Sequence, residues 1–266
     1  MYKLYHGDCR KFLFDGTIEP DSIDLTVTSP PYDNLRSYNN SSTWGWPEFF
    51  AIAAGLWRVT KPGGVVVWVV NDATVKGSET GSSFEQALLF KKMGFNLHDT
   101  MIYSKPNFSA VGALQTRYAP TFEYMMVFAK GRLSTFNPIK DRICKTKGKI
   151  KSGTIRQKDG SVKRMSNEGW VQPAFGQRYN VWNLSPQTQN GHPAPFPEQL
   201  AHDHILSWSN EGDTVFDPFL GSGTTGAACA HLGRKFIGCE IDDKYFDIAK
   251  ARIEQAHQKI GEELAG

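Results

Sequence analysis

The residues best suited to chemistry lie in two short turns that are far apart in the chain. The first turn is Thr28-Ser29-Pro30-Pro31-Tyr32, in which two consecutive prolines remove two backbone donors and fix φ twice. The resulting stiff turn displays carbonyl and hydroxyl acceptors beside an aromatic ring. A flat group with an amino function fits this surface, because its NH2 can donate to Ser29 Oγ and the Pro30 carbonyl while Tyr32 stacks on its plane. The alternative is a proline pair that only ends a strand.

The second turn is the glycine-rich segment DPFLGSGTTG at residues 217–226. Glycines let the backbone approach a ligand closely, and a helix that begins at such a turn presents free amides. Glu240 lies 17 residues after Gly223, at the end of the next expected strand, where its carboxylate can accept both hydroxyls of a ribose. The turn therefore predicts a cofactor that contains adenosine. Gly221, Gly223 and Gly226 also satisfy G-x-G-x-x-G, so a nicotinamide or flavin cofactor is a possible alternative. A second alternative is a glycine turn that binds no ligand and serves only helix packing.

Both turns need a sheet to position them, and the sequence predicts strands that alternate with helices. Strand patterns occur at residues 23–28, 65–70, 97–103, 122–129, 214–216 and 235–239. Helical spacing of apolar residues occurs at residues 46–59, 82–92, 198–209, 224–232 and 243–264. This alternation is typical of an α/β fold with parallel strands. Only 43 residues follow Gly223, so most of the sheet must come from the N-terminal half, and the usual order of such folds is permuted.

The net charge of +3 is small, but the charges are unevenly distributed. Residues 130–164 contain twelve Lys and Arg against two acids, whereas the rest of the chain has a net charge of −7. Phosphates neutralised by such a segment release counterions, so we expect a nucleic acid as the partner. Polar and aromatic residues that follow, among them Trp170 and Tyr179, favour this interpretation over a solvated surface loop.

Composition and motif spacing exclude several other classes of protein. With 40% hydrophobic and 21% charged residues, the chain is typical of a folded globular domain. Its longest apolar runs have six residues, far below the ~20 that span a bilayer, and no secretory signal is visible. The four cysteines show no zinc-ligand spacing, so we expect reduced thiols in a cytoplasmic protein. We also expect no metal, and we interpret His202 and His204 as surface or capping residues.

Together, these segments resemble the β-class DNA amino-methyltransferases, in which the catalytic motif comes first, a target-recognition region follows and the cofactor motif comes last. TSPPY (28–32) is similar to the catalytic motif, DPFLGSGTTGAA (217–228) to the S-adenosylmethionine loop, and HPAPFPEQL (192–200) to the segment before that loop. IGCEID (237–242) carries the acidic ribose residue, and YHGDC (5–9) resembles the Gly-Asp element near the cofactor adenine. KPGG (61–64) and FEYMMVFAKG (122–131) are similar to later strands of the family.

The resemblance implies a Rossmann-like methyltransferase fold with a mostly parallel central sheet, a circularly permuted motif order and S-adenosylmethionine as the cofactor. It divides the chain into a catalytic domain, residues 1–131 and 192–266, and an inserted target-recognition region, residues 132–191. The expected catalytic residues are Ser29, Pro30, Pro31 and Tyr32. The expected cofactor-binding residues are Asp8, Asp217, Pro218, Phe219, Gly221, Gly223, Thr224 and Glu240. The expected DNA-binding residues are Arg36, Lys145, Lys147, Lys149, Lys151, Arg156 and Arg164.

The implied reaction is methyl transfer to the exocyclic amine of a base flipped out of double-stranded DNA. Within the family, Ser before Pro-Pro is the usual cytosine-N4 form and Asp or Asn the usual adenine-N6 form. A hydroxyl and a carboxylate both accept from an NH2, so Ser29 leaves both targets open. C5-cytosine chemistry is set aside, because the family that performs it uses a Pro-Cys dipeptide that does not occur here.

The resemblance is also compatible with a homodimer, although no dimer seam is evident, and it identifies no restriction endonuclease partner. Two alternatives stay open on the sequence alone. One is an oxidoreductase that uses the glycine-rich turn for a dinucleotide. The other is a DNA-binding module without catalytic activity.

Overall fold

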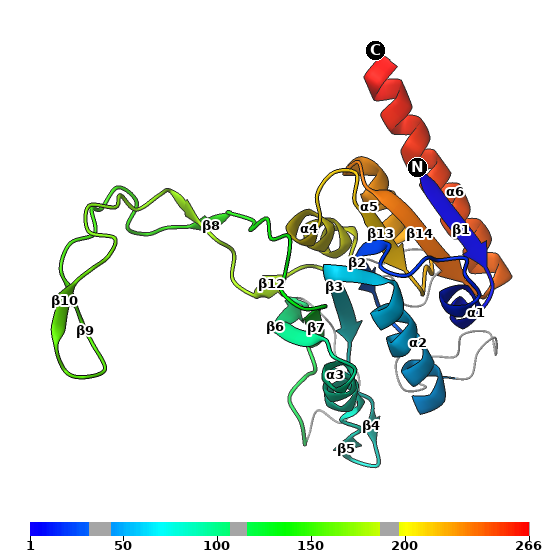
Figure 1. Ribbon diagram of the computed structural model, residues 1–266, viewed down its shortest axis with the longest axis horizontal. Coiled ribbons are helices and arrows are strands. Elements are labelled where there is room, and N and C mark those ends of the chain that lie inside the picture. The colour runs from blue at the N-terminus through cyan, green and yellow to red at the C-terminus, as the bar shows by residue number, and fades with distance from the viewer. Residues whose placement is uncertain (32–43, 107–115, 187–196, 266) are drawn as a thin grey trace. The chain divides into compact units, whose positions relative to one another are not determined.

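The chain forms an α/β fold in which helices cover both faces of one large sheet (Figure 1). The structure is a computed structural model that describes residues 1–31, 44–106, 116–186 and 197–265. Two compact units make up the chain. Unit 1 comprises residues 1–137 and 180–266, and unit 2 comprises residues 138–179.

The large sheet belongs to unit 1 and has eight strands. In spatial order they are β1 (Tyr2–His6), β14 (Lys235–Glu240), β13 (Thr214–Asp217), β2 (Ile23–Thr28), β3 (Thr60–Val70), β7 (Phe122–Ala129), β6 (Asn96–Ser104) and β12 (Val181–Asn183). Neighbouring strands of this sheet pair in parallel, except that β7 runs antiparallel to both β3 and β6. A separate short hairpin consists of β4 (Thr74–Val75) and β5 (Ser78–Glu79).

Helices pack on both faces of this sheet, so its central strands are buried on both sides. The helices α1 (Cys9–Phe14), α2 (Trp46–Val59) and α3 (Ser82–Lys92) contribute to one apolar core. The helices α4 (Glu198–Trp208), α5 (Thr224–His231) and α6 (Asp243–Ala265) contribute to the other. Successive residues of β3 alternate between the two cores, with Val67 in one and Trp68 in the other. This double burial explains the continuous apolar run in β3.

The order in which successive strands are added to the sheet reverses between β13 and β2. From β13 the chain passes through α5 to β14 on one side, and from β2 it passes through α2 to β3 on the other side. Such a point is a topological switch point, and in open α/β sheets ligands bind there, at the carboxyl ends of the strands. The architecture therefore singles out the ends of β13 and β2 before any side chain is considered.

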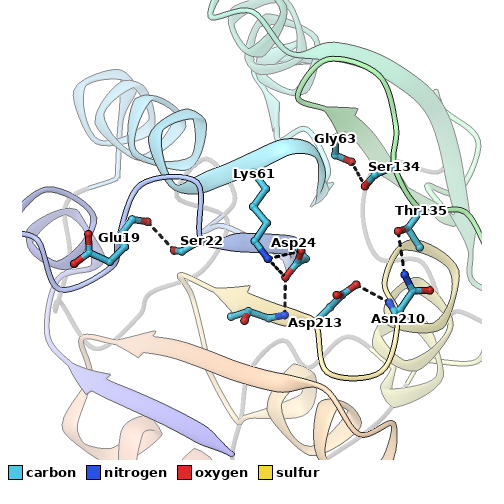
Figure 2. A network of polar contacts seen from close by, with 10 residues as sticks. Glu19, Ser22, Asp24, Lys61, Gly63, Ser134, Thr135, Asn210 and Asp213 are labelled. Atoms are coloured by element: carbon cyan, nitrogen blue, oxygen red, sulfur yellow. Dashed lines mark hydrogen bonds and ion pairs between the residues drawn. The ribbon is translucent and has the colours of Figure 1, made fainter.

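Polar contacts fix the opposite, amino-terminal ends of the same strands (Figure 2). The Asp24 carboxylate accepts from Lys61 Nζ at 2.7 Å and from the backbone N–H of Thr214 at 2.9 Å, so it connects β2, β3 and β13. Nearby, the Ser134 hydroxyl donates to the Gly63 carbonyl at 2.9 Å. These contacts hold the central strands in register far from the switch point.

The start of β3 differs from the sequence prediction. We expected residues 61–64 to form a turn before a strand at 65–70, but β3 begins at Thr60. Ile23 pairs with Thr60 and Leu25 with Val65, so the intervening KPGG segment bulges out of the ladder, and Gly63 has a φ of +85°. The bulge reconciles a turn-like sequence with continuous strand pairing.

Unit 2 is an antiparallel hairpin whose two arms join at several points. It contains the strands β8 (Arg142–Ile143), β9 (Thr154–Arg156), β10 (Val162–Arg164) and β11 (Phe175–Gly176). β8 pairs with β11, and β9 pairs with β10. This unit is shorter than the insert expected at residues 132–191, because residues at both borders join unit 1. Asn137 N donates to the Ser207 carbonyl at 2.8 Å, and β12 pairs with β6.

Candidate active site

The two turns identified in the sequence start from neighbouring strands. β13 pairs with β2 in parallel, with Phe216 opposite Thr26. At the carboxyl ends of these strands, the Thr28 hydroxyl donates a hydrogen bond of 2.6 Å to Asp217 Oδ1, and both side chains are buried. The double-proline turn that follows Thr28 and the glycine-rich turn that follows Asp217 therefore meet at one place, which is the switch point of the sheet.

Asp217 is buried, and its carboxylate joins the two turns. Besides the Thr28 hydroxyl, it accepts from the backbone N–H of Phe219 at 3.1 Å and from the Thr225 hydroxyl at 2.8 Å. Burial raises the pKa of Asp217 to about 6. The hydrogen bonds act against this rise, and the charge of Glu240 adds to it. These three donors belong to the protein, so the carboxylate holds the shape of the turn. The expected contact of Asp217 with the cofactor stays a prediction.

The other residues of the double-proline turn continue directly from β2. Pro30 is buried, whereas Ser29 and Pro31 are half-buried. Because β2 lies between β13 and β3, the turn starts beside the glycine-rich turn on one side and the end of β3 on the other. Tyr32 and Arg36 lie outside the described residues, as do residues 192–196 of the HPAPFPEQL segment.

Two of the three glycines in the second turn are required by packing. Gly223 has a φ of +79°, and a Cβ there would lie 2.9 Å from Ala249 Cα of α6. A Cβ at Gly226 would lie 2.4 Å from Ile253 Cδ1. Both glycines thus allow α5 to pack closely against α6. Gly221, with a φ of +52°, instead directs its N–H to the carboxylate at the end of β14.

That carboxylate is Glu240, which ends β14 as predicted. Its Oε2 accepts from Gly221 N at 2.7 Å, and its Oε1 accepts from Ile241 N and Asp242 N at 3.0 Å. Burial raises the pKa of Glu240, although these amide bonds act in the opposite direction. A carboxylate offers about four acceptor positions, and donors from the described residues fill three of them, so one position on Oε2 is open. The expectation that Glu240 accepts both hydroxyls of a ribose stays a prediction.

Asp8 lies near Glu240 because their strands are neighbours. His6 pairs with Glu240 across β1 and β14, and Asp8 follows two residues later as the N-cap of α1. Its carboxylate accepts from Arg10 N at 2.9 Å and forms an ion pair with the Arg10 guanidinium. Burial alone would raise the pKa of Asp8, but the hydrogen bonds and charge of Arg10 lower it below its usual value. Asp8 is therefore a charged group at the same edge of the sheet.

An aromatic cluster surrounds the start of the glycine-rich turn. The Phe219 ring is half-buried and lies edge-on to Trp44, with 5.5 Å between centroids, and to Trp68, with 6.2 Å. Trp68 in turn pairs with Thr28 across β3 and β2. Pro218 is buried beside Asp217. The cluster thus holds Phe219 against Trp68 of β3, which neighbours the strand that carries the double-proline turn.

Arg252 of α6 is a residue of this region that we did not identify from the sequence. Its Nη1 donates to Thr224 Oγ1 at 3.0 Å, and its Nη2 donates to Glu198 Oε2 at 3.1 Å. Thr224, an expected cofactor residue, is buried, and its hydroxyl is held by this contact. Only the rotation of α6 relative to α5 reveals the contact, and no pattern in the sequence gives that rotation.

The two histidines of α4 differ in their surroundings. His202 is half-buried, but His204 is buried in the core, which corrects our expectation of surface or capping residues. Trp208 Nε1 donates to His204 Nδ1 at 3.1 Å, and burial lowers the pKa of His204 to about 3. The spacing of Leu200, His204 and Trp208, four residues apart, could have shown that they share one helix face.

Within the described ranges, no group of three or more His, Cys, Asp and Glu residues is arranged to hold a metal ion. None of the helices in these ranges is long and apolar enough to cross a membrane.

Six of the expected DNA-binding residues lie together in unit 2. They are Lys145, Lys147, Lys149, Lys151, Arg156 and Arg164. All are exposed except Lys151, which is half-buried because its ammonium lies 4.9 Å from the centroid of the Trp170 ring. Lys145 and Lys147 fall in a turn of the hairpin, whereas Arg156 and Arg164 lie on β9 and β10.

The double-proline turn, the glycine-rich turn and the carboxylate of Glu240 thus lie at the switch point of one α/β sheet. The chain belongs to the N6/N4 DNA methylase family, whose profile matches residues 23–251. It is 53% identical over 243 residues to the orphan methyltransferase M.BamHII of Bacillus amyloliquefaciens, which covers 87% of this chain and 89% of that protein.

Solved structures of methyltransferases have the same fold. The M1.HpyAVI–SAM complex matches with a TM-score of 0.64 and 24% identity, over 95% of this chain and 99% of that chain. The PvuII DNA methyltransferase, described as cytosine-N4-specific, matches with a TM-score of 0.67 and 20% identity, over 97% and 92% of the two chains. The expected fold class, family and cofactor are confirmed: the protein is a DNA methyltransferase, and its cofactor is S-adenosylmethionine.

Proposed function

We propose that the protein transfers a methyl group from S-adenosylmethionine to the exocyclic amine of a base in double-stranded DNA, at cytosine N4 or adenine N6. The observation that carries this proposal is the 2.6 Å hydrogen bond between Thr28 and Asp217. It connects the turn suited to an amine with the turn suited to the cofactor, at the switch point where α/β sheets bind ligands. Methyl transfer needs donor and acceptor to be adjacent in this way.

On the acceptor side, we propose that Ser29 Oγ and the Pro30 carbonyl accept hydrogen bonds from the two N–H groups of the amine. The lone pair of such an amine is delocalised into the ring, so it is a weak nucleophile. Two acceptors draw the nitrogen toward tetrahedral geometry and return electron density to its lone pair. No strong base is needed, because the methylated amine becomes acidic and loses its proton to the turn or to water. Preorganised acceptors of this kind supply most of the rate enhancement.

On the donor side, the residues at the ends of β13 and β14 fit an adenosine-bearing cofactor. The bound cofactor supplies a methyl group on a sulfonium sulfur, which leaves as a thioether. We propose that Glu240 accepts a ribose hydroxyl at its remaining position, that Asp8 lies toward the adenine, and that Phe219 covers the cofactor. The backbone of Gly221, Gly223 and Thr224 would line the turn, while Asp217 and Pro218 shape it.

For the DNA, we propose that the target base leaves the duplex, because the amine cannot reach the double-proline turn while it is stacked. Flipping costs a few kcal/mol, part of which stacking on Tyr32 would offset. Arg36 and the basic residues of unit 2 would bind the duplex, so the insert at residues 132–191 serves target recognition. A cytoplasmic location and a homodimer, both expected above, belong to the same proposal.

The decisive measurement is mass spectrometry of nucleosides from duplex DNA incubated with the protein and isotope-labelled S-adenosylmethionine. We expect label in N4-methylcytosine or in N6-methyladenine, and the mass identifies the target directly. Sequencing of the same DNA with modification detection locates the recognition site. Unlabelled DNA, from a protein that still binds S-adenosylhomocysteine, would refute the proposed activity.

A further inference from the structure

Unit 2 is a long hairpin with almost no core of its own. Backbone hydrogen bonds connect its arms from the base, where Arg178 N donates to the Ile139 carbonyl, to the tip, where Gln157 N donates to the Ser161 carbonyl, both at 2.8 Å. Of residues 138–179, all of which the structure describes, only Cys144 is buried. Two-stranded hairpins are marginally stable in water, so we expect a binding partner to stabilise this unit.

The charge of the hairpin indicates what that partner is. Residues 138–179 contain eleven Lys and Arg against three acids. Each acid already has a partner inside the unit: Asp141 with Arg178, Asp159 with Ser161, and Glu168 with Arg164. The other basic groups are therefore left to neutralise an external polyanion, which for a DNA methyltransferase is its substrate.

The register of β9 and β10 determines which side chains near the tip share one face of the ribbon. Val162 pairs with Arg156, and Arg164 pairs with Thr154. Directly opposed residues of an antiparallel pair, and residues two apart on one strand, point to the same face. One face of the ribbon thus carries these four side chains, and the other face carries Ile155 and Lys163.

Arg156 differs from its neighbour on that face. Arg164 Nη1 lies 3.7 Å from Glu168 Oε2. The Arg156 guanidinium, by contrast, has no hydrogen-bond or ion-pair partner within the described part of the chain. A guanidinium presents a planar fork of donors that matches O6 and N7 of guanine, and methyl groups such as those of Thr154 and Val162 suit the methyl group of thymine. The major groove, about 12 Å wide, admits a two-stranded ribbon.

We propose that the β9–β10 ribbon enters the major groove of the target DNA and that Arg156 reads a guanine there. Lys145, Lys147, Lys149 and Lys151, which lie toward the base of the hairpin, contact phosphates and carry no sequence information. This inference rests on the proposed function, since it assigns separate tasks to the basic residues of the insert.

The test selects preferred sequences from a duplex library with random positions, using the full-length protein with S-adenosylhomocysteine. Arg156→Ala is expected to lose preference for guanine at one position by roughly tenfold to a hundredfold and to keep the other positions. Arg156→Lys keeps the charge and loses the fork, so we expect the same change with an unaltered salt dependence. Lys163→Ala on the opposite face is the matched control, which should weaken all sequences equally.

Unchanged sequence preference in both Arg156 variants would overturn the inference, and so would a wild-type protein that selects no sequence at all. Because the selection measures binding, its result is separate from methyl transfer. A protein that methylates DNA while Arg156→Ala keeps the wild-type preference contradicts only the assignment of Arg156. A protein whose preference changes in the variants but which transfers no methyl group contradicts only the proposed function.

Discussion

At the scale of single residues, the hydrogen bond between Thr28 and Asp217 determines whether the site forms. It is buried, and the same carboxylate also holds Phe219 N and the Thr225 hydroxyl. Removing an acceptor in such surroundings leaves donors without partners, each at a cost of about 1–3 kcal/mol. Asp217 therefore positions the two turns relative to each other.

A pair of Asp217 variants tests this role. Asp217→Ala should lower the free energy of unfolding by about 3 kcal/mol or more, because three donors lose their acceptor. Asp217→Asn keeps an acceptor for Thr28 and Phe219 N, and its NH2 can donate to the Thr225 hydroxyl, so its cost should be smaller. Urea unfolding of both variants measures the difference. Equal stability of Asp217→Ala and wild type would contradict the role.

The same variants predict a pH dependence. Because the pKa of Asp217 is raised from 3.8 to about 6, its protonated form is favoured in the folded state. In the wild type, the contribution of Asp217 to the free energy of unfolding is therefore fully present below about pH 4. It is lost as the pH rises through 6. Asn does not titrate, so between pH 4 and 6 the stability of Asp217→Asn should rise relative to wild type by roughly 2 kcal/mol. Urea unfolding across this range checks the slope.

Ser29 offers a direct test of the chemical step. Ser29→Ala removes one of the two acceptors proposed for the amine, so kcat should fall by about 10²- to 10³-fold, while S-adenosylhomocysteine binds as before. The matched control is Ser22→Ala at the other end of β2, where the hydroxyl donates to the Glu19 carbonyl at 2.6 Å. We expect no change in turnover there. If both variants turned over like wild type, Ser29 would have no part in the reaction.

How far the sequence predicts a site residue depends on whether its neighbours in space are also neighbours in the chain. Glu240 was located because a strand end and a glycine turn lie within one short segment. The partner of Thr28 lies 189 residues away, and Arg252 contacts Thr224 only through the packing of two helices. Those contacts depend on strand order and helix rotation, which no local pattern encodes.

At the scale of elements, the close packing of α5 against α6 depends on glycines, which have no side chain. Gly226→Ala places a Cβ 2.4 Å from Ile253 Cδ1 and 2.7 Å from Phe236 Cε1, so we expect a loss of about 1–3 kcal/mol in stability. Gly261→Ala is the control, because a Cβ at that exposed position of α6 meets nothing within 4 Å, and the change should stabilise by about 0.5–1 kcal/mol. Denaturant midpoints of the two variants should move in opposite directions, and a shared direction would refute this account.

The elements predicted with accurate bounds are those with a strong apolar pattern. The bounds of α2 and α3 agree with the predicted ranges 46–59 and 82–92, because their buried faces repeat at helical spacing. We missed β1, which is a partly exposed edge strand, and α1, which has six residues. β12 was also missed because three residues are too few for a pattern. In unit 2, both faces of the strands are exposed, so no alternation marks them.

At the scale of the whole molecule, unit 2 concentrates positive charge that the rest of the chain lacks. Replacing Lys145, Lys147, Lys149 and Lys151 with Gln should weaken binding to every duplex and reduce the slope of log K against log salt by up to ~4. The control replaces Lys235, Lys244, Lys250 and Lys259 of unit 1, which are exposed, and should leave the slope near wild type. Filter binding at several salt concentrations gives both slopes. Identical slopes for the two quadruple variants would show that the lysines of unit 2 bind no phosphates.

The pairing of β2 with β13 also affects folding of the chain during its synthesis on the ribosome. Thr28 is synthesised 189 residues before Asp217, which corresponds to roughly 10–40 s at usual elongation rates. During that interval, one side of β2 has no neighbouring strand, so the nascent chain carries an apolar edge that invites aggregation. A prematurely terminated product that ends before β13 contains one half of the site without the other. We therefore expect truncated chains to lack methyl-transfer activity, and activity to begin only when synthesis is nearly complete.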